Sequence, residues 1–549
     1  MYFDLPLMRQ RSPAYVPLRP SSSDSDRSFP KFYLDTPSYT PSSEHLRENL
    51  NRSPSRWGPL QYIPVSGSEF YVAVSPRRPL YKLLRGLLWT AILLPIVLGF
   101  LVIFTTAFRP SYTHAPSHYN ELRERAVQST EPGRGNIHNE KVFIAASLYD
   151  ANGTLVGGSW SQNILDLVDL LGPENVHLSI YENDPDDLAK DALESFKSRV
   201  KCNSTLVAEH LPLEDIRRVP LPNGEKRIKR IAYLAETRNR ALRPLDDIET
   251  KFDKLLFLND VYFNPIDAAQ LLFSTNLDSN GKTDYRAACA VDFINPFKFY
   301  DTFATRDLEG HSMSLPFFPW FPNAGLADTR SDVVNQKDAV RVRSCWGGMV
   351  AYEARWFQST PDLTNADPVE GTAWGAAFAS GRTELSGIPT NTSTLRFRFE
   401  DRTYWEASEC CLINADIQKP RDPANPHAPS GIFMNPYVRT AYDEYTLLWL
   451  PLTRRPERLY SLIHDILNRI VGLPGNNPRR TQEPGDLVME RVWQQDAAAS
   501  NTTEPIGSWK EVERIAGPGS FCGSRKLLVL GEKEGESKWM HFAAPPEDV

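Results

Sequence analysis

Several motifs that define common enzyme classes are absent from this chain of 549 residues. It has no Gly-x-x-x-x-Gly-Lys phosphate loop, no His-Glu-x-x-His motif and no Gly-x-Ser-x-Gly turn, which excludes the usual ATPase, zinc-protease and esterase classes. A basic excess is also missing, since 61 basic residues stand against 68 acidic ones and the net charge is −7. Dedicated nucleic-acid-binding proteins usually carry such an excess, so we expect no nucleic-acid partner.

Cysteine is scarce, and its spacing excludes the common zinc motifs because no Cys-x-x-Cys pair occurs. The six cysteines are Cys202, Cys289, Cys345, Cys410, Cys411 and Cys522. An even number permits disulfides in an oxidising compartment, with all pairings open at this point. Adjacent cysteines rarely bond to each other, because the ring would be strained. Cys410 and Cys411 are therefore expected to pair elsewhere or to be buried.

One long hydrophobic run stands out near the N-terminus. Residues 86–108 contain no ionisable side chain. A helix of this length spans a hydrocarbon core of about 30 Å at about 1.5 Å per residue. A buried core helix is the alternative, but one of this length without a charge is uncommon. A cleaved signal peptide fits less well, since the run lies far from Met1. We predict a single transmembrane helix.

The charges that flank this run set the expected topology. Four basic residues precede it closely (Arg77, Arg78, Lys82 and Arg85), whereas only Arg109 follows closely. The positive-inside rule then places the N-terminus in the cytosol and everything after residue 110 in the lumen. Residues 1–85 carry 12 basic and 7 acidic side chains, a net charge of +5, and the remainder carries −12. Four glycosylation sequons lie after the run, at Asn152, Asn203, Asn391 and Asn501, and one at Asn51 lies before it.

Composition divides the chain into five expected parts. Residues 1–85 are rich in Ser, Pro and Arg and are predicted to be a disordered cytosolic tail. The transmembrane helix at 86–108 is followed by a polar stem at 109–140 that contains several Pro and Gly residues. Residues 141–470 form the expected catalytic domain. Residues 471–549 are again rich in Pro, Gly and Asn and are interpreted as a peripheral C-terminal extension.

From residue 141 onward, apolar strands alternate with amphipathic helices. We predict strands at 142–149, 176–181, 206–209, 255–258, 287–293 and 395–399, and helices at 164–171, 188–200, 228–245 and 266–273. Alternation at this spacing indicates crossover connections. The expected fold class is α/β, with a mostly parallel central sheet and helices on both faces.

Polar residues follow several of the predicted strands directly. Glu182 and Asn183 end the second strand, Asn259 and Asp260 end the central apolar strand, and Asp292 lies in the next. Ligands of open parallel sheets bind outside the carboxyl ends of the strands. Mg²⁺ and Mn²⁺ prefer oxygen ligands and share their coordination shell with substrate phosphates. The acids are candidate ligands for a metal–diphosphate complex, although each one alone is equally compatible with a helix cap or a solvated turn.

Three further segments contain candidate site residues. Arg238 and Asn239 lie late in a basic helix whose other charges are expected to face solvent, and an arginine there could bind a diphosphate. Trp346 and Gly347 belong to a tight turn in which the ring could stack on a sugar or base, or simply pack. Glu409, beside the paired cysteines, is a candidate carboxylate or an ordinary surface acid.

Five ordered blocks resemble one known family. They lie at residues 230–245, 256–263, 290–293, 344–349 and 408–412, and they are similar to the fungal α-1,3-mannosyltransferases, the cryptococcal mannosyltransferase and capsule-associated protein group. The resemblance covers roughly residues 140–420. It implies a type II membrane glycosyltransferase of the Golgi with a GT-A-like nucleotide-sugar-binding fold. GDP-mannose would be the donor, a mannose-containing glycan the acceptor, and the product an α-1,3 linkage formed with retention.

The resemblance also assigns roles to the candidate residues. Asn259-Asp260-Val261 looks like a variant of the Asp-x-Asp metal signature in which Asn259 replaces the first acid, so Asp260 is the expected ligand of Mn²⁺ or Mg²⁺. Asp292 or Asp416 would complete the shell. The remaining roles are diphosphate binding for Arg238, with Asn239 beside it, ribose or base binding for Glu182 and Asn183, and a catalytic role for Glu409 or Asp292.

Two other functions compete with this reading. A membrane-anchored glycan-binding or scaffold protein would keep Trp346 but would need no acid placed for a metal. A glycoside hydrolase would need two carboxylates at a defined separation across a sugar, which spacing along the sequence does not test.

Overall fold

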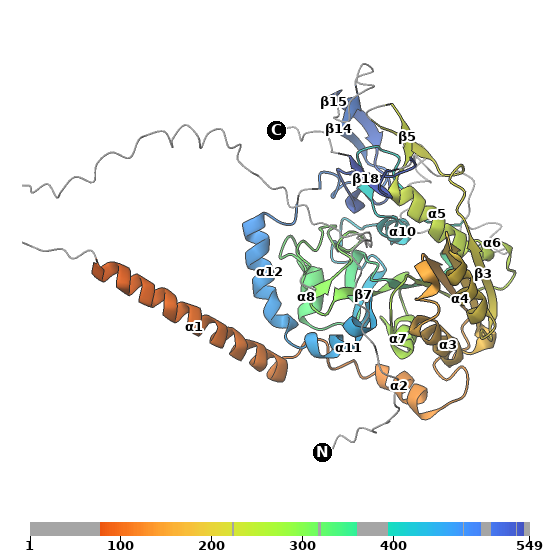
Figure 1. Cartoon of the computed structure of the whole chain (residues 1–549), viewed down its shortest axis with the longest axis horizontal. Coiled ribbons are helices and arrows are strands. Elements are labelled where there is room, and N and C mark those ends of the chain that lie inside the picture. The colour runs from red at the N-terminus through yellow and green to blue at the C-terminus, as the bar shows by residue number, and fades with distance from the viewer. Residues whose placement is uncertain are drawn as a thin grey trace, which may run out of the picture. The chain divides into compact units, whose positions relative to one another are not determined.

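The computed structural model describes residues 77–221, 224–316, 320–358, 394–475, 477–495, 507–533 and 535–542. The chain divides into two units, Met1–Lys82 and Leu83–Val549. The tail predicted for residues 1–85 lies almost wholly outside the described residues. The second unit contains the α/β body (Figure 1).

The predicted membrane span is helical. Helix α1 (Arg77–Phe108) includes a stretch, Lys82–Phe108, that is long and apolar enough to cross a membrane, the single such helix among the described residues. None of its most apolar segment is buried, which argues against the alternative of a core helix. Pro95 is accommodated inside the helix.

The body is built on a mixed ten-stranded sheet in the order β3-β2-β1-β6-β11-β7-β13-β10-β9, with β8 paired to β7. The first four strands are parallel: β3 (Asn203–Glu209), β2 (Val176–Asn183), β1 (Val142–Leu148) and β6 (Lys254–Leu258). β11 (Met349–Glu353) runs antiparallel to β6 and to β7 (Ala287–Asn295), and β13 (Ile432–Ala441) is parallel to β7. The other members are β10 (Val340–Ser344), β9 (Arg306–Asp307) and β8 (Lys298–Phe299). The predicted α/β class with a largely parallel sheet is confirmed.

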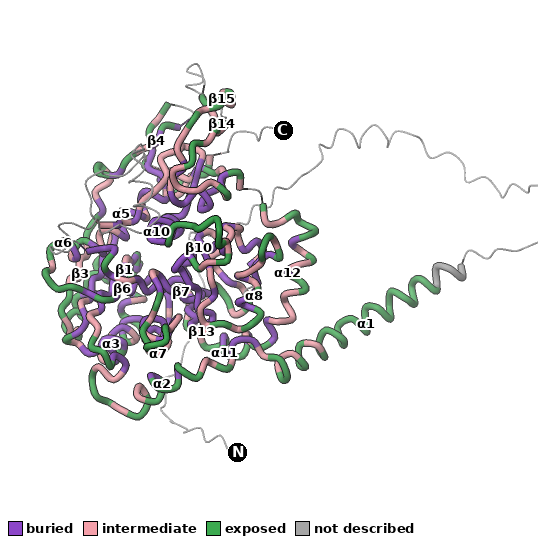
Figure 2. Tube along the Cα trace, turned by 180° about the vertical axis from the view of Figure 1, so that it is seen from behind, coloured by how far each residue is buried: buried purple, intermediate pink, exposed green. Residues whose placement is uncertain are grey.

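Helices cover both faces of this sheet because neighbouring strand residues point to opposite sides. In β1, Phe143 contributes to the core under α5 (Arg230–Leu242), whereas Ile144 contributes to the core under α3 (Ser159–Leu171) and α7 (Pro265–Ser274). Both residues are fully buried, and Figure 2 shows the central strands as buried. Such continuous burial explains why these strands are apolar throughout.

The remaining helices have clear local signals. α4 (Asp187–Lys197) begins at Asp186, whose side chain accepts from the Ala189 amide, and Asn264 caps α7 in the same way. The others are α2 (Tyr119–Gln128), α6 (Pro244–Asp247), α8 (Asp328–Val334), α10 (Glu409–Ile417), α11 (Glu444–Thr453) and α12 (Glu457–Val471). The helix expected at 228–245 is therefore two helices, α5 and α6.

The strand expected at residues 395–399 is wrong. No strand is present there; instead the backbone amide of Leu395 donates to the carbonyl of Trp356, and Phe397 is bonded to the side chain of Asn239. The alternation of apolar residues reflects burial of Leu395 and Phe397 in the core without a neighbouring strand.

Much of the expected stem packs on the body. Tyr112, Tyr119 and Leu122 are buried, and the amide of Ser111 donates to the carbonyl of Arg455. Tyr119 also accepts a hydrogen bond from Asn435 of β13 at 2.6 Å. The chain therefore joins the folded body within three residues of the end of α1.

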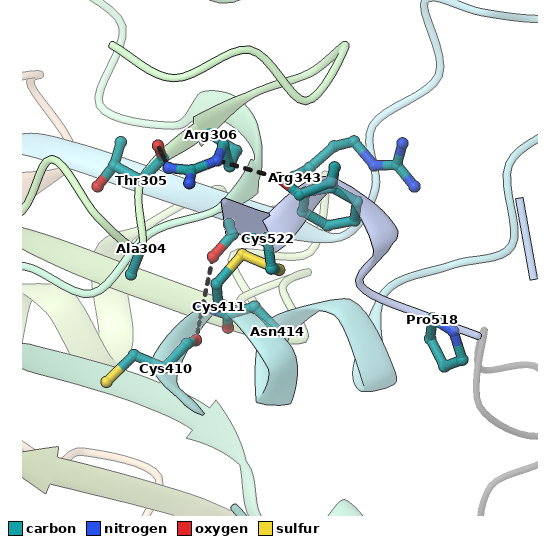
Figure 3. Close-up of a disulfide and its surroundings, with 12 residues drawn as sticks. Ala304, Thr305, Arg306, Arg343, Cys410, Cys411, Asn414, Pro518 and Cys522 are labelled. Atoms are coloured by element: carbon teal, nitrogen blue, oxygen red, sulfur yellow. Dashed lines mark hydrogen bonds between the residues drawn. A yellow bond between two sulfur atoms is a disulfide. The ribbon is translucent and has the colours of Figure 1, made fainter. Parts of the chain in front are cut away.

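The C-terminal extension also belongs to the body. A disulfide joins Cys411 of α10 to Cys522 (Figure 3). β16 (Gly523–Ser524) pairs with β12 (Glu406–Ala407). Further pairs are β14 (Leu487–Gln495) with β15 (Gly507–Ile515), β17 (Leu527–Leu530) with β18 (Trp539–Phe542), and β4 (Arg218–Pro220) with β5 (Lys226–Ile228). A second disulfide joins Cys289 to Cys345. Cys410 is buried and forms no disulfide, so its side chain is a free thiol. The expectation that Cys410 and Cys411 do not bond to each other is confirmed.

Candidate functional site

One edge of the sheet collects most of the predicted site residues. β2, β6, β7 and β13 run in the same direction, so their carboxyl ends meet at this edge. They bring Glu182, Asn183, Asn259, Asp260 and Asp292 together. The turn before β11 reaches the same edge, because Met349 pairs with Leu258.

The end of β2 holds two buried oxygens that lack a hydrogen-bond donor. The carboxylate of Glu182 accepts from the Asp150 amide at 2.7 Å through Oε1, but Oε2 has no partner. Asn183 donates to the hydroxyl of Tyr233 at 2.6 Å, whereas its Oδ1 is unpaired. Burial, together with the charges of Asp150 and Asp260, raises the pKa of Glu182 to about 7. Unpaired buried acceptors are costly, so these two oxygens are positioned to accept from a ligand.

Arg238 occupies the centre of the edge. Its Nε donates to Glu409 at 3.0 Å and its Nη1 donates to Asn259 at 2.8 Å. The guanidinium lies 4.6 Å from the centre of the Trp346 ring, within range of a cation–π contact. These contacts link α5, α10, β6 and the turn before β11 through a single side chain, which is 8% exposed. These two hydrogen bonds use only some of the five N–H donors of the Arg238 guanidinium.

Asp260 is the accessible one among the predicted acids of the edge. Asp260 is exposed to solvent, yet the surrounding protein desolvates its carboxyl group and raises the pKa. The positive charge of Arg238 lowers the same pKa but has the smaller effect. No group of three or more His, Cys, Asp or Glu side chains suited to a metal occurs in the parts of the chain that the structure describes. A cation at Asp260 would therefore depend on ligand oxygens, which suits Mg²⁺ or Mn²⁺ bound with a diphosphate.

Asp292 is buried completely and held from two sides. Its carboxyl accepts from the hydroxyl of Tyr442 at 3.1 Å and from the backbone amide of Asp301 at 3.1 Å. Burial and the nearby Asp301 carboxylate raise the pKa of Asp292 to about 8. Tyr442 stacks edge-on against Tyr300, with ring centres 4.5 Å apart. Asp292 is thus protonated near neutral pH and supports the two tyrosines.

The turn at residues 345–348 requires its glycines. Gly347 has φ +61°, and an added Cβ would lie 1.9 Å from the carbonyl oxygen of Ala290. Gly348, at φ +68°, would place a Cβ 2.6 Å from Val261. The turn is fixed further by the hydroxyl of Thr440, which donates to the Gly347 carbonyl at 2.9 Å.

Two predicted residues lie in other contacts. The amide of Asn239 is bonded in both directions to the backbone of Phe397, at 2.8 and 2.9 Å. Asp416 forms a two-bond ion pair with Arg398, at 2.8 Å for each bond. Neither arrangement directs the side chain to the strand ends.

Sequence reasoning missed Asp150 and Tyr442. Asp150 follows β1 and accepts from the amides of Leu155 and Val156 at 2.9 and 2.8 Å, so the strand-end rule could have found it. Tyr442 follows β13, a strand whose run is interrupted by Asn435 and Pro436. Because β13 was not predicted, the strand-end rule could not identify Tyr442.

These features define an α/β protein with a polar sheet edge that combines unpaired buried oxygens, a positioned arginine and an accessible acid. A family model described as cryptococcal mannosyltransferase 1 matches residues 141–416, half of the chain. The chain belongs to this mannosyltransferase family, which confirms the resemblance found in the sequence.

Solved structures give more distant likenesses. One is a mannosyltransferase from Pyrobaculum calidifontis in complex with GDP-mannose and Mn²⁺, at 13% identity, covering 69% of this chain and 77% of that one, with a TM-score of 0.27. A second is residues 1–349 of TarS from S. aureus in complex with UDP, at 10% identity, 61% and 72% coverage and a TM-score of 0.25. A third is mannosyl-3-phosphoglycerate synthase from Rubrobacter xylanophilus, at 12% identity, 74% and 99% coverage and a TM-score of 0.26. No curated protein sequence matches the chain.

Proposed function

We propose that this protein is a type II membrane mannosyltransferase with a GT-A-like fold, which transfers mannose from GDP-mannose to a mannose-containing glycan. One observation carries the proposal: Arg238, the accessible Asp260 and the unpaired oxygens of Glu182 and Asn183 lie along one sheet edge in a member of a mannosyltransferase family. An α-1,3 linkage formed with retention, and a Golgi location, belong to the same proposal.

The edge provides a binding mode for the donor. Glu182, protonated or ionised, and Asn183 accept from the ribose hydroxyls or the base through the oxygens that lack a partner. Arg238 is held in place by Glu409 and Asn259 and binds the diphosphate with donors that those bonds leave over. Asp260 would hold Mn²⁺ or Mg²⁺, which offsets the charge on the departing GDP when bound.

Glu409 and Asp292 remain the two candidates for the carboxylate that serves the transferred sugar. Glu409 touches Arg238 directly and is therefore joined to the proposed diphosphate site by a single hydrogen bond. Asp292 has no hydrogen bond to Arg238 among those of the described residues; it accepts from the hydroxyl of Tyr442, which contacts Tyr300. Trp346 is buried, and its ring is already packed against Arg238, beside Gly347 in the turn before β11.

The topology completes the proposal. α1 is the membrane anchor, the 1–85 tail is cytosolic, and the body with the stem and C-terminal extension is lumenal. The two sequons that the structure describes, at Asn152 and Asn203, have exposed side chains, as glycosylation in the lumen would need.

The test uses the full-length chain in lipid nanodiscs with a panel of nucleotide sugars and mannosides, in Mn²⁺ or Mg²⁺, with products identified by mass spectrometry. We expect transfer from GDP-mannose, and we expect Asp260→Ala to reduce kcat/KM at least about 100-fold, as loss of electrostatic stabilisation at a reacting centre does. Asp187→Ala is the matched control, since Asp187 is an exposed acid on α4 whose side chain is 99% accessible.

Retained activity in Asp260→Ala would remove the metal assignment. Thermal stabilisation separates the enzyme from a glycan-binding protein. A shift with GDP and Mn²⁺ together favours the transferase, whereas a shift with mannosides alone and no product in the panel would favour the binding protein.

A further inference from the structure

Helices α11 and α12 expose an unusual amount of apolar surface. Their large apolar side chains that are at least two-fifths exposed are Tyr445, Leu448, Trp449, Leu452, Leu462, Ile463, Ile466, Ile470 and Val471. We call these nine residues the α11–α12 surface. The two helices are consecutive, since only three residues separate Thr453 from Glu457. On each helix they recur three and four residues apart and so gather on one face. Such gathered apolar residues mark a binding surface, whereas single ones are scattered on an ordinary protein.

α12 follows the pattern of a helix packed on a protein in water only in part, because Tyr460 packs on the core but the buried residues of the helix are polar. Its inward face carries buried polar residues, Glu457, His464 and Asn468, while Leu462 and Ile466 point outward. The polar face is fixed by specific contacts: Glu457 pairs with Arg439 at 2.6 Å, and His464 bonds the carbonyl of Met313 at 3.1 Å. A rotation that buried the apolar side would break these bonds. The outward apolar face is therefore a built feature of the fold.

Aromatic residues on α11 match the composition of a membrane interface. Tyr445 and Trp449 are exposed and lie with ring centres 5.9 Å apart, and Leu448 beside them is 79% exposed. Tyrosine and tryptophan prefer the boundary between headgroups and acyl chains, because their rings are apolar with one polar group. Arg455, exposed in the connection to α12, suits the headgroup layer.

The chain itself places this surface near the membrane. α1 ends at Phe108, and three residues later the amide of Ser111 donates to the carbonyl of Arg455, between α11 and α12. The next carbonyl, that of Tyr112, accepts from Nη1 of Arg454 at 2.9 Å. Three residues reach at most about 10 Å. If α1 spans the bilayer, the connection between α11 and α12 lies within this distance of the end of the span.

We propose that the α11–α12 surface docks into the lumenal leaflet, with its apolar side chains at the level where headgroups meet acyl chains. The inference rests on α1 being a membrane anchor, as proposed above, and adds a second, peripheral contact. Two observations favour lipid over a soluble partner as the occupant. The buried residues of α12 are polar while its exposed ones include large apolar side chains, and only residues 109–111 separate the end of α1 from the contact with Arg455. Docking orients the catalytic body, because β13 runs from the site at Tyr442 into α11 through the cap Asp443.

The experiment uses the full-length chain in phosphatidylcholine nanodiscs that contain a lipid with a photoreactive diazirine on its acyl chain, at no more than one chain per disc. Lipid adducts are mapped by mass spectrometry. We expect adducts in residues 83–108 and in residues 444–471. In the double variant Leu462→Glu/Ile466→Glu, adducts in 444–471 should fall about tenfold, since each charge opposes insertion, while those in 83–108 persist. Leu188→Glu is the control, because Leu188 is 60% exposed on α4.

Wild-type chains labelled in 83–108 but not in 444–471 would overturn the proposal. It is overturned equally if, in separate discs that hold two chains carrying photoreactive leucine, the α12 segments crosslink to each other and receive no lipid adducts, which would assign the surface to a second copy. Labelling does not depend on turnover, so failure of the donor assignment would leave this result unaffected.

Discussion

Replacing Asp292 by asparagine is expected to stabilise the protein at neutral pH. The carboxyl is fully buried, and burial with the neighbouring Asp301 raises its pKa from 3.8 to about 8. Below pH 3.8 the group is protonated in both the folded and the unfolded chain, so it has no effect on stability. Between pH 3.8 and 8 the unfolded chain releases the proton and the folded chain retains it, so the free energy of unfolding falls as pH rises.

The size of the effect follows from this difference. The penalty grows by about 1.4 kcal/mol for each pH unit above 3.8, which amounts to about 4 kcal/mol at pH 7. Asparagine mimics the protonated carboxyl but has one acceptor oxygen instead of two, so one bond, to Tyr442 or to the Asp301 amide, is weakened at a cost of about 1 kcal/mol. We expect a net gain of about 3 kcal/mol at pH 7 and a small loss at pH 4.

The assay is unfolding of the full-length chain in detergent at pH 4 to 8, followed by tryptophan fluorescence. Asp416→Asn is the matched control, because Asp416 is equally buried but forms a two-bond ion pair with Arg398, which would then lose the closer of its ion pairs and keep the one to Glu400. We expect that control to be destabilised by about 3 kcal/mol or more. If Asp292→Asn lowers stability at pH 7, or if the dependence on pH is unchanged, the reasoning about Asp292 is refuted.

Three other substitutions test separate parts of the structure. Gly347→Ala should destabilise the body by at least about 3 kcal/mol in thermal unfolding, because an added Cβ overlaps the carbonyl oxygen of Ala290 in a neighbouring strand. Gly281→Ala is the control and should cost about 1 kcal/mol, since Gly281 has φ +75° but nothing lies within 4 Å of the added Cβ. Equal effects of the two substitutions would contradict this account of the turn. Replacing Cys411 and Cys522 by Ala should remove about 4 kcal/mol of stability, since the disulfide closes a separation of 111 residues. Proteolysis of this variant should then release the C-terminal segment first. Unchanged protection from the protease would count against this role of the disulfide. The pKa of Glu182 is about 7, so its carboxyl ionises beside other acids as pH rises. KM for the donor should therefore increase from pH 6 to 8 in the wild type and stay level in Glu182→Gln. Parallel pH profiles of the two proteins would show that Glu182 does not face the donor.

The central part of the fold was predictable because its strands are buried on both faces. β1 and β6 are apolar over nearly their whole length, and the predicted bounds fall within a residue of the observed ones. β13 escaped prediction because Asn435 and Pro436 interrupt it, and its register with β7 shifts between Met434 and Arg439. The two-residue strands β8 and β9 are too short to leave any pattern.

The candidate site was predictable as far as the strand-end rule applies. That rule uses only the local position of a polar residue, and it located Glu182, Asn259 and Asp260 at one edge. It could not show which polar groups were already paired, because the partners lie far along the chain. Asn239 is bonded to Phe397, 158 residues away, and this contact depends on a loop that has no regular structure.

The paired and unpaired groups along the edge reduce the repulsion that the proposed anionic donor would meet at this acidic site. Glu182 and Asp292 both have raised pKa values because they are buried, so near neutral pH much of their negative charge is suppressed. Glu409 is offset by Arg238, which leaves Asp260 as the accessible carboxylate among the predicted residues at this edge. A diphosphate at this edge would therefore meet Arg238 and the accessible Asp260 rather than a row of ionised carboxylates. In the proposed function, a divalent cation at Asp260 would offset the remaining repulsion, and oxygens of the diphosphate would complete its shell where Asn259 stands in place of the first acid.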